Sequence, residues 1–165
     1  MSYGDYWFIL NYTLNEAEQK LAQHLSKRRY EHARSNGIKD LKMGEQSNYE
    51  TDLEGVAAEI AFSKLANVYP DLDIGLTKDW DVIYKGFKID VKVSKYKTAK
   101  LLATLKKTDC DIDYYVLLTG VFPGPYTLRG VARKCDLIQA KNVSNLGRGN
   151  GYMLEQKDLK SFDTI

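Results

Sequence analysis

The pattern of apolar and polar positions predicts two helices at the start of the chain. The first opens with Thr13-Leu14-Asn15-Glu16, a capping-box pattern, carries apolar residues at helical spacing, and runs to about Ser35 before Asn36-Gly37. Residues 36–50 are polar and contain glycine, which predicts a loop. A second helix, from Thr51 to about residue 67, is apolar almost all round, so we expect it to pack inside the protein against a sheet.

After the helices the pattern changes to short runs of β-branched and aromatic residues, which predict strands. The first twelve residues are rich in aromatics and predict an edge strand or a segment packed on the body, and 133–140 predicts a short helix. The expected strands lie at 72–76, 80–84, 87–93, 114–119 and 126–132, and residues 101–105 predict another short element. Together these elements predict an α/β fold with a central mixed sheet of about four to five strands flanked by helices.

The strands at 80–84 and 87–93 are separated only by Lys85-Gly86, a plausible two-residue turn, and so predict a tight hairpin. In that register Tyr84 faces Phe87 and Val82 faces Ile89, which would place Asp81 directly opposite Asp90. Opposed side chains in an antiparallel pair lie ~5 Å apart. Lys92, two residues beyond Asp90, would share the same face because side chains alternate along a strand.

Two facing carboxylates repel each other unless a cation compensates them. A divalent ion bound by Asp81 and Asp90 would do so, and oxygen ligands without histidine or thiolate favour Mg²⁺, with Mn²⁺ as an alternative. Two simpler interpretations compete: both acids as ordinary exposed strand residues, and Lys92 in a cross-strand ion pair with Asp79, its opposite in this register.

Glu59 lies in the middle of the apolar second helix, where an unpaired carboxylate is costly. It must therefore find a cation or keep a proton. Glu54, in the predicted first turn, is explained by capping, although either glutamate is a candidate for the acid that this helix would present to a site.

Charge is distributed unevenly along the chain. The segment 85–107 contains eight lysines and one acid, so it carries +7 in a protein whose net charge is +2. Such a stripe is typical of a surface that binds a polyanion, although lysines also protect exposed strand edges. The basic half of the first helix, 27–34, would either grip phosphates or complement the helix dipole. The lysines expected to contact nucleic acid are Lys88, Lys95, Lys97, Lys100, Lys106 and Lys107.

The spacing Asp81…Asp90-Val91-Lys92 with an upstream helical Glu59 resembles the PD-(D/E)XK nuclease superfamily over roughly residues 51–132. Within it, small phage and bacterial members are the closer likeness. The segments that carry it are Leu53-Glu54-Gly55-Val56-Ala57-Ala58-Glu59, Ile89-Asp90-Val91-Lys92, Tyr115-Val116-Leu117 and Gly151-Tyr152-Met153-Leu154. Trp80 stands where the superfamily's variable motif proline would be.

The resemblance implies a restriction-endonuclease-like core in one domain, with a helical part at 13–50, the core at 51–132 and a C-terminal part at 133–165. It implies metal binding by Asp81, Asp90 and Glu59 and assistance to the attacking water by Lys92. The expected function is a Mg²⁺-dependent deoxyribonuclease, an endonuclease rather than an exonuclease, with DNA as its partner and a homodimer possible. The alternatives are a nucleic-acid-binding protein without catalysis, such as a phage accessory protein, and a hydrolase of small phosphates.

Composition is that of an ordinary folded protein, with 44% hydrophobic and 28% charged residues. No apolar run approaches the ~18–20 residues that span a bilayer, and the first twelve residues lack the basic start of a signal peptide. We therefore expect no membrane association and a location in the cytoplasm of a bacterium or a phage-infected host cell.

Overall fold

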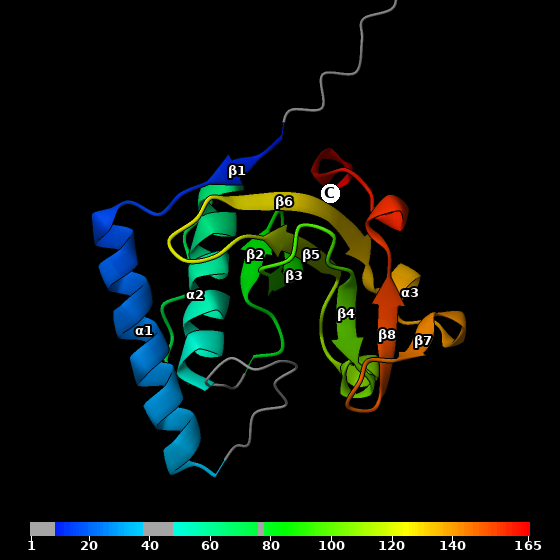
Figure 1. The fold of residues 1–165 in the computed structure, drawn as a ribbon, viewed down its shortest axis with the longest axis horizontal. Helices are drawn as coiled ribbons and strands as arrows, with labels where there is room; N and C mark the ends of the chain where they lie inside the picture. The colour runs from blue at the N-terminus through cyan, green and yellow to red at the C-terminus, as the bar shows by residue number, and fades with distance from the viewer. Residues whose placement is uncertain (1–8, 38–47, 76–77) are drawn as a thin grey trace, which may run out of the picture.

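A computed structural model describes residues 9–37, 48–75 and 78–165 of the chain (Figure 1). Two long helices, α1 (Glu16–Ser35) and α2 (Asn48–Leu65), precede most of the strands. The short helices are α3 (Lys134–Leu137), η1 (Leu105–Asp109), η2 (Ala140–Asn142), η3 (Gln156–Asp158) and η4 (Phe162–Thr164). The strands are β1 (Asn11–Tyr12), β2 (Val82–Tyr84), β3 (Phe87–Ser94), β4 (Leu101–Thr104), β5 (Tyr114–Thr119), β6 (Tyr126–Arg133), β7 (Val143–Asn145) and β8 (Asn150–Leu154).

The main sheet is mixed and has five strands in the order β1-β6-β5-β3-β2. Its pairs are antiparallel except β3 and β5, which run parallel with Asp90 beside Tyr115. The chain crosses from β3 to β5 through β4 and η1, as a parallel pair requires a long connection. The protein therefore has the predicted α/β fold, and its mixed sheet is compatible with a restriction-endonuclease-like core.

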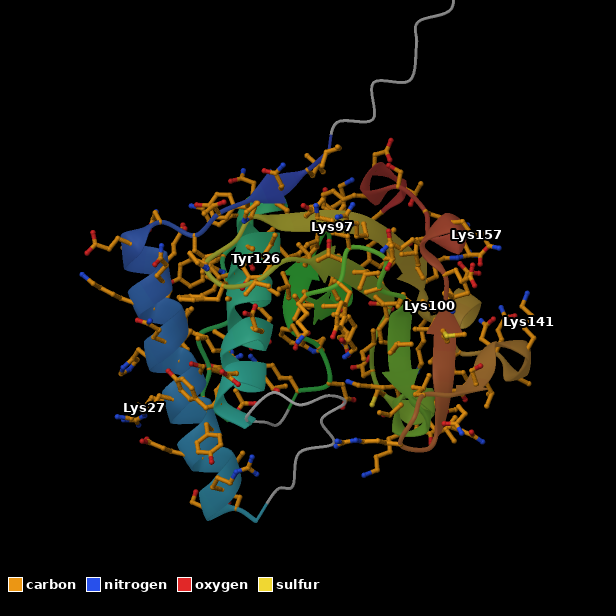
Figure 2. The ribbon with its side chains drawn as sticks, in the orientation of Figure 1. Lys27, Lys97, Lys100, Tyr126, Lys141 and Lys157 are labelled. Carbon is orange, nitrogen blue, oxygen red and sulfur yellow. The ribbon has the colours of Figure 1, made fainter. Side chains whose placement is uncertain are left out.

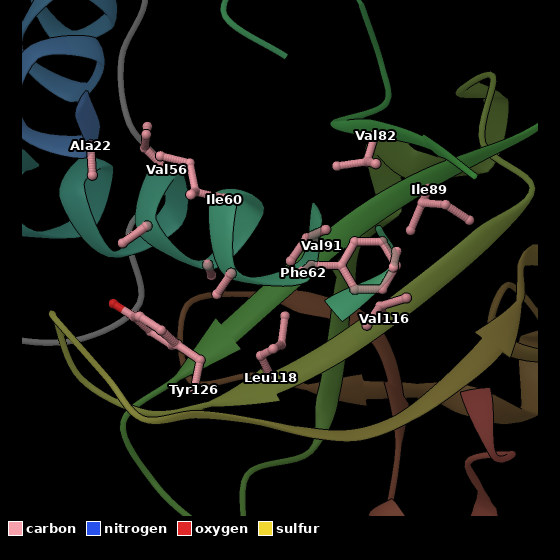
Figure 3. Close-up of a cluster of buried hydrophobic side chains, with 14 of the residues drawn as sticks. Ala22, Val56, Ile60, Phe62, Val82, Ile89, Val91, Val116, Leu118 and Tyr126 are labelled. Atoms are coloured by element: carbon pink, nitrogen blue, oxygen red, sulfur yellow. The ribbon is translucent and has the colours of Figure 1, made fainter. Parts of the chain in front are cut away.

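The two faces of the main sheet are covered differently. Val116 and Leu118 of β5 join one buried cluster with α1 and α2, whereas Tyr115 and Leu117 join a second cluster with β4, β8 and α3. Figure 3 shows the first cluster, in which Phe62 of α2 packs against strand residues such as Val116. Both long helices thus lie on one face (Figure 1), and a second sheet of order β4-β8-β7, which the sequence did not predict, lies on the other.

The helix boundaries correct two sequence predictions. The capping box of α1 is formed by Asn15 and Glu18, each accepting the other's backbone amide at 2.9 Å, and not by Thr13 and Glu16. Leu14 is buried and its amide donates to Pro123, so the chain is not yet helical there. Helix α2 begins at Asn48 rather than Thr51, with Glu50 complementing the dipole in its first turn.

The remaining predictions divide into confirmed and wrong elements. β1 is the expected edge strand; residues 1–8 of that segment, like 38–47 of the predicted loop, lie outside the described residues. Strands β2, β3, β5 and β6 lie where predicted, the short element expected at 101–105 is β4, and the helix expected over 133–140 is only the short α3. The strand predicted at 72–76 is wrong over its described residues, 72–75; the carbonyl of Asp73 accepts a hydrogen bond from Arg29 instead of entering a ladder.

Within the described ranges, no helix is both long enough and apolar enough to span a bilayer.

Candidate active site

The hairpin of β2 and β3 has the predicted register, with Val82 paired to Ile89 and Tyr84 to Phe87. Its turn places Lys85 at φ 50° and Gly86 at φ 83°, as a two-residue turn with both central residues left-handed requires. Strand β2 begins at Val82, so Asp81 lies just before the strand rather than in a strand pair with Asp90. The hairpin still brings Asp81 to the β3 strand that carries Asp90.

Asp81 is fixed at the edge of β3 by two hydrogen bonds. Its amide donates to the carbonyl oxygen of Ile89 at 2.8 Å, and its Oδ2 accepts from the amide of Val91 at 2.7 Å. Burial raises the pKa of Asp81 well above its usual range, as do the charges of Glu59 and Asp90, against the opposing effects of Lys92 and the Val91 amide. The carboxylate is therefore held in place with two other acids near it.

Asp90, only 1% exposed, is contacted by two lysines from different elements. Lys92 of β3 places Nζ 2.5 Å from Oδ1, and Lys107 of η1 places Nζ 2.8 Å from Oδ2. Burial lowers the pKa of Lys107, but the opposite charge of Asp90 outweighs this effect, so the pKa of Lys107 is raised overall. Although Lys92 Nζ is this close, the buried Oδ1 makes no hydrogen bond with any residue that the structure describes.

The alternative partner of Lys92, Asp79, is engaged elsewhere. The Oδ2 atom of Asp79 accepts the amide of Asp111 at 2.9 Å, and the Asp79 carbonyl lies 3.5 Å from Lys107 Nζ. Lys92 is thus on the predicted face, with Asp90 rather than Asp79 as its ion-pair partner. Asp90 is buried, so the interpretation of it as an exposed strand residue is wrong.

Glu59 approaches the same place from α2. Its Oε2 accepts from Arg29 Nη1 of α1 at 2.7 Å, and both side chains are mostly buried, at 16% and 15% exposed. Burial raises the pKa of Glu59; Arg29 opposes this, and the charges of Asp71 and Asp90 add to it. Arg29 is therefore the cation that compensates Glu59 in its apolar surroundings.

Glu54 has a different environment. Its carboxylate accepts the amide of Phe122 at 2.8 Å and the hydroxyl of Tyr126 at 2.7 Å. Since α2 begins at Asn48, Glu54 is not a first-turn cap; it ties the helix to the loop before β6. Of the two helix acids, Glu59 is the one that interacts with the site: its charge raises the pKa of Asp81, and the charge of Asp90 raises its own pKa.

Arg29 is the site residue that sequence reasoning missed. It lies in the basic half of α1, for which phosphate binding and dipole compensation were the two interpretations. Instead its guanidinium holds Glu59 and donates at 3.0 Å to the carbonyls of Asp71 and Asp73. The buried position of Glu59 indicated that it needs a cation. Nothing in the sequence, however, selects Arg29 from the other basic residues of the first helix.

The six lysines expected to contact nucleic acid do not form one uniform surface. Lys107 belongs to the carboxylate cluster, Lys88 pairs with Asp111, and Lys100 lies 3.6 Å from Glu155. Lys95 is exposed with Nζ 5.2 Å from the centroid of the Tyr96 ring. Lys97 and Lys106 are exposed. Figure 2 places Lys97 and Lys100 around the connection from β3 to β4.

The donor set fits a hard divalent cation in its chemistry. The three acids offer only oxygen ligands, and among the described residues the buried Asp90 Oδ1 has the Lys92 ammonium beside it but no hydrogen-bond partner. Across the described ranges, no group of three or more acidic, histidine or cysteine side chains is arranged so that it could hold a metal ion. In this conformation Arg29, Lys92 and Lys107 supply the positive charge instead.

The site thus combines residues of α1, α2, the segment before β2, β3 and η1: Arg29, Glu59, Asp81, Asp90, Lys92 and Lys107. Comparisons of the chain with protein-family models, with curated proteins and with solved structures found no match.

Proposed function

We propose that this protein is a Mg²⁺-dependent endonuclease that hydrolyses phosphodiester bonds of DNA. The observation that carries the proposal is the position of Asp81 against β3: its Oδ2 accepts from the Val91 amide, and the charges of Asp90 and of Glu59 from α2 raise its pKa. On β3 itself, Lys92 contacts Asp90. Clustering buried acids is costly, and such clusters of perturbed carboxylates occur preferentially at functional sites.

Asp81, Asp90 and Glu59 would hold Mg²⁺ or Mn²⁺ through their oxygens. When bound, the ion makes water a better nucleophile at neutral pH and stabilises charge on the phosphate oxygens. Asp81 is suited to the role because its Oδ2 is fixed by the Val91 amide. Asp90 contributes Oδ1, which is buried, pairs with the Lys92 ammonium and makes no hydrogen bond within the described part of the chain.

Lys92 would act on the phosphate or the attacking water. Its side chain is 32% exposed while its Nζ lies 2.5 Å from a buried carboxylate, so the ammonium stands at the boundary between the site and solvent. From there it can neutralise the scissile phosphate or orient the water. Lys107 and Arg29 are positioning residues in this scheme, because each holds one carboxylate.

DNA would be held by the lysines of the stripe that lie outside the carboxylate cluster, among them Lys95, Lys97 and Lys106. Contacts to phosphates give salt-sensitive affinity that is largely independent of sequence. Cutting both strands commonly uses two active sites, so we include a homodimer on DNA in the proposal. Its location would be the cytoplasm of a bacterium or of a phage-infected host cell.

The test is cleavage of plasmid and oligonucleotide DNA by the purified protein with Mg²⁺, with Mn²⁺ and with EDTA. We expect cleavage with either metal, none with EDTA, and a loss of at least about 100-fold in Asp90→Ala and Lys92→Ala, typical of removing a group from the reacting centre. Asp158→Ala, which removes an exposed acid in η3, is the matched control and should cleave normally.

One observation favours a second candidate, a nucleic-acid-binding protein that does not cleave. Arg29, Lys92 and Lys107 already balance Glu59 and Asp90 within the protein. Tight DNA binding without cutting under every metal condition, unaffected by Asp90→Ala, would favour this candidate and contradict the nuclease.

A further inference from the structure

A groove of about 600 Å³ opens beside the candidate site, on the face of the main sheet opposite α2. One wall is the end of β3 with the segment that follows it, and the other is the small sheet of β4, β7 and β8. Its apolar lining is formed by Leu102, Leu117 and Met153. Such a volume is typical of a small-molecule site and is far too small for a duplex.

The groove is continuous with the candidate centre through Lys92. This lysine lines the groove and places its Nζ 2.5 Å from Asp90 Oδ1. Ser94, two residues further along β3 on the same side, also lines it. A group lying in the groove would therefore have the Lys92 ammonium between it and the buried carboxylate.

The other lining residues fit a nucleotide. Tyr96 is 64% exposed at the groove, with the Lys95 ammonium 5.2 Å from its ring centroid. Lys100 adds a second cation to the wall, and Asn145 adds an amide opposite. An aromatic ring beside cations is the combination that binds single-stranded nucleic acid, because bases stack on the ring and phosphates meet the charges.

We propose that this groove holds an unpaired nucleotide next to the scissile phosphate, with its base stacked on Tyr96. The inference rests on the proposed function and deepens it: the substrate is single-stranded DNA, or DNA with a flap or branch, rather than continuous duplex. A base in the groove leaves its phosphate on the side of Lys92, where the reacting group is needed.

The experiment is fluorescence anisotropy of labelled oligonucleotides in EDTA, with a single strand of about 12 nucleotides, within the range that one binding groove covers, and the matching duplex. We expect Tyr96→Ala to weaken single-strand binding about 5- to 100-fold, the range for one stacked base, and to change duplex binding less than about twofold. Tyr96→Phe keeps the ring and should bind as the wild type does. Tyr69→Ala removes a tyrosine that is 81% exposed and is the matched control.

Three results overturn the groove assignment: single-strand binding unchanged in Tyr96→Ala, an equal loss for single strand and duplex, or no single-strand binding by the wild type. Thermal unfolding of each variant shows that the fold is intact. Since these measurements need no cleavage, they test the groove independently of the proposed nuclease activity. Metal-dependent cleavage with no role for Tyr96 would refute the groove alone, and Tyr96-dependent binding without cleavage under any metal would refute the nuclease alone.

Discussion

At the scale of single residues, Asp81 shows how a cluster of acids lowers the stability of the fold. Its pKa is raised by burial and by Glu59 and Asp90, so its ionised form is disfavoured in the folded protein. A carboxyl group whose pKa is higher folded than unfolded stabilises the fold at low pH. That contribution is lost as pH rises from the unfolded pKa, ~3.9, through the folded pKa.

Asp81→Asn should therefore be more stable than the wild type at pH 7, by about 0.5–2 kcal/mol, while losing metal-dependent cleavage. The amide oxygen can still accept from Val91, so the local structure is kept. Urea unfolding of both proteins from about pH 3.5 to about pH 8 checks this: the advantage should be absent at the acid end and grow with pH. A variant less stable than the wild type at pH 7 would contradict this account of Asp81.

The pair of Arg29 and Glu59 gives a second prediction. Arg29→Met leaves a mostly buried carboxylate without its cation and should cost about 3 kcal/mol of unfolding free energy. In Arg29→Met with Glu59→Gln the unpaired charge is gone, so we expect the double variant to be more stable than Arg29→Met alone. Urea unfolding of the wild type, the two single variants and the double variant measures the coupling. Additive effects would mean that the pair contributes nothing specific.

At the scale of elements, the β2–β3 hairpin depends on its turn. Gly86 lies at φ 83°, where a side chain is strained, although a Cβ there would meet no atom of the described residues within 4 Å. Gly86→Ala should therefore destabilise the protein by about 1 kcal/mol through backbone strain alone. The DNA cleavage rate of Gly86→Ala should fall as well, in proportion to the fraction of molecules that keep the native hairpin.

Gly55→Ala is the matched control, because Gly55 lies in α2 without a positive φ, and a Cβ added there would also meet no atom within 4 Å. It should stabilise the protein by about 0.5–1 kcal/mol, since alanine favours helix. Thermal unfolding of the two variants compares them directly. Effects of the same sign would show that the turn does not require its left-handed conformation.

The same elements show what the sequence could predict. The hairpin register followed from local turn chemistry and alternation, so the approach of Asp81 to Asp90 was accessible from residues 80–93 alone. The small sheet was not, because β4 pairs with β8, which is distant in the chain, and β7 is only three residues long. The contact of Lys107 in η1 with Asp90 was not predictable either, because it depends on how separate elements pack and not on a local pattern.

At the scale of the whole molecule, Lys97 and Lys100 lie around the connection from β3 to β4, whereas Lys141 of η2 lies away from it near β7 (Figure 2). If DNA is bound there, Lys97→Ala should reduce the slope of log affinity against log salt by about 0.9, the value for one duplex phosphate contact. Lys141→Ala, also at an exposed position, should leave the slope unchanged. Duplex binding titrations between about 50 and 200 mM salt make the comparison. Equal slopes for all three proteins would place DNA elsewhere.

Whether one ion is bound by the acids of α2, of the segment before β2 and of β3 can be seen directly by diffraction from crystals soaked in Mn²⁺. We predict an anomalous peak in contact with oxygens of Asp81 and Asp90, with Glu59 bound directly or through water. A soaked crystal with no peak there, in which Lys92 and Lys107 still hold Asp90 and Arg29 still holds Glu59, would contradict the proposed metal centre.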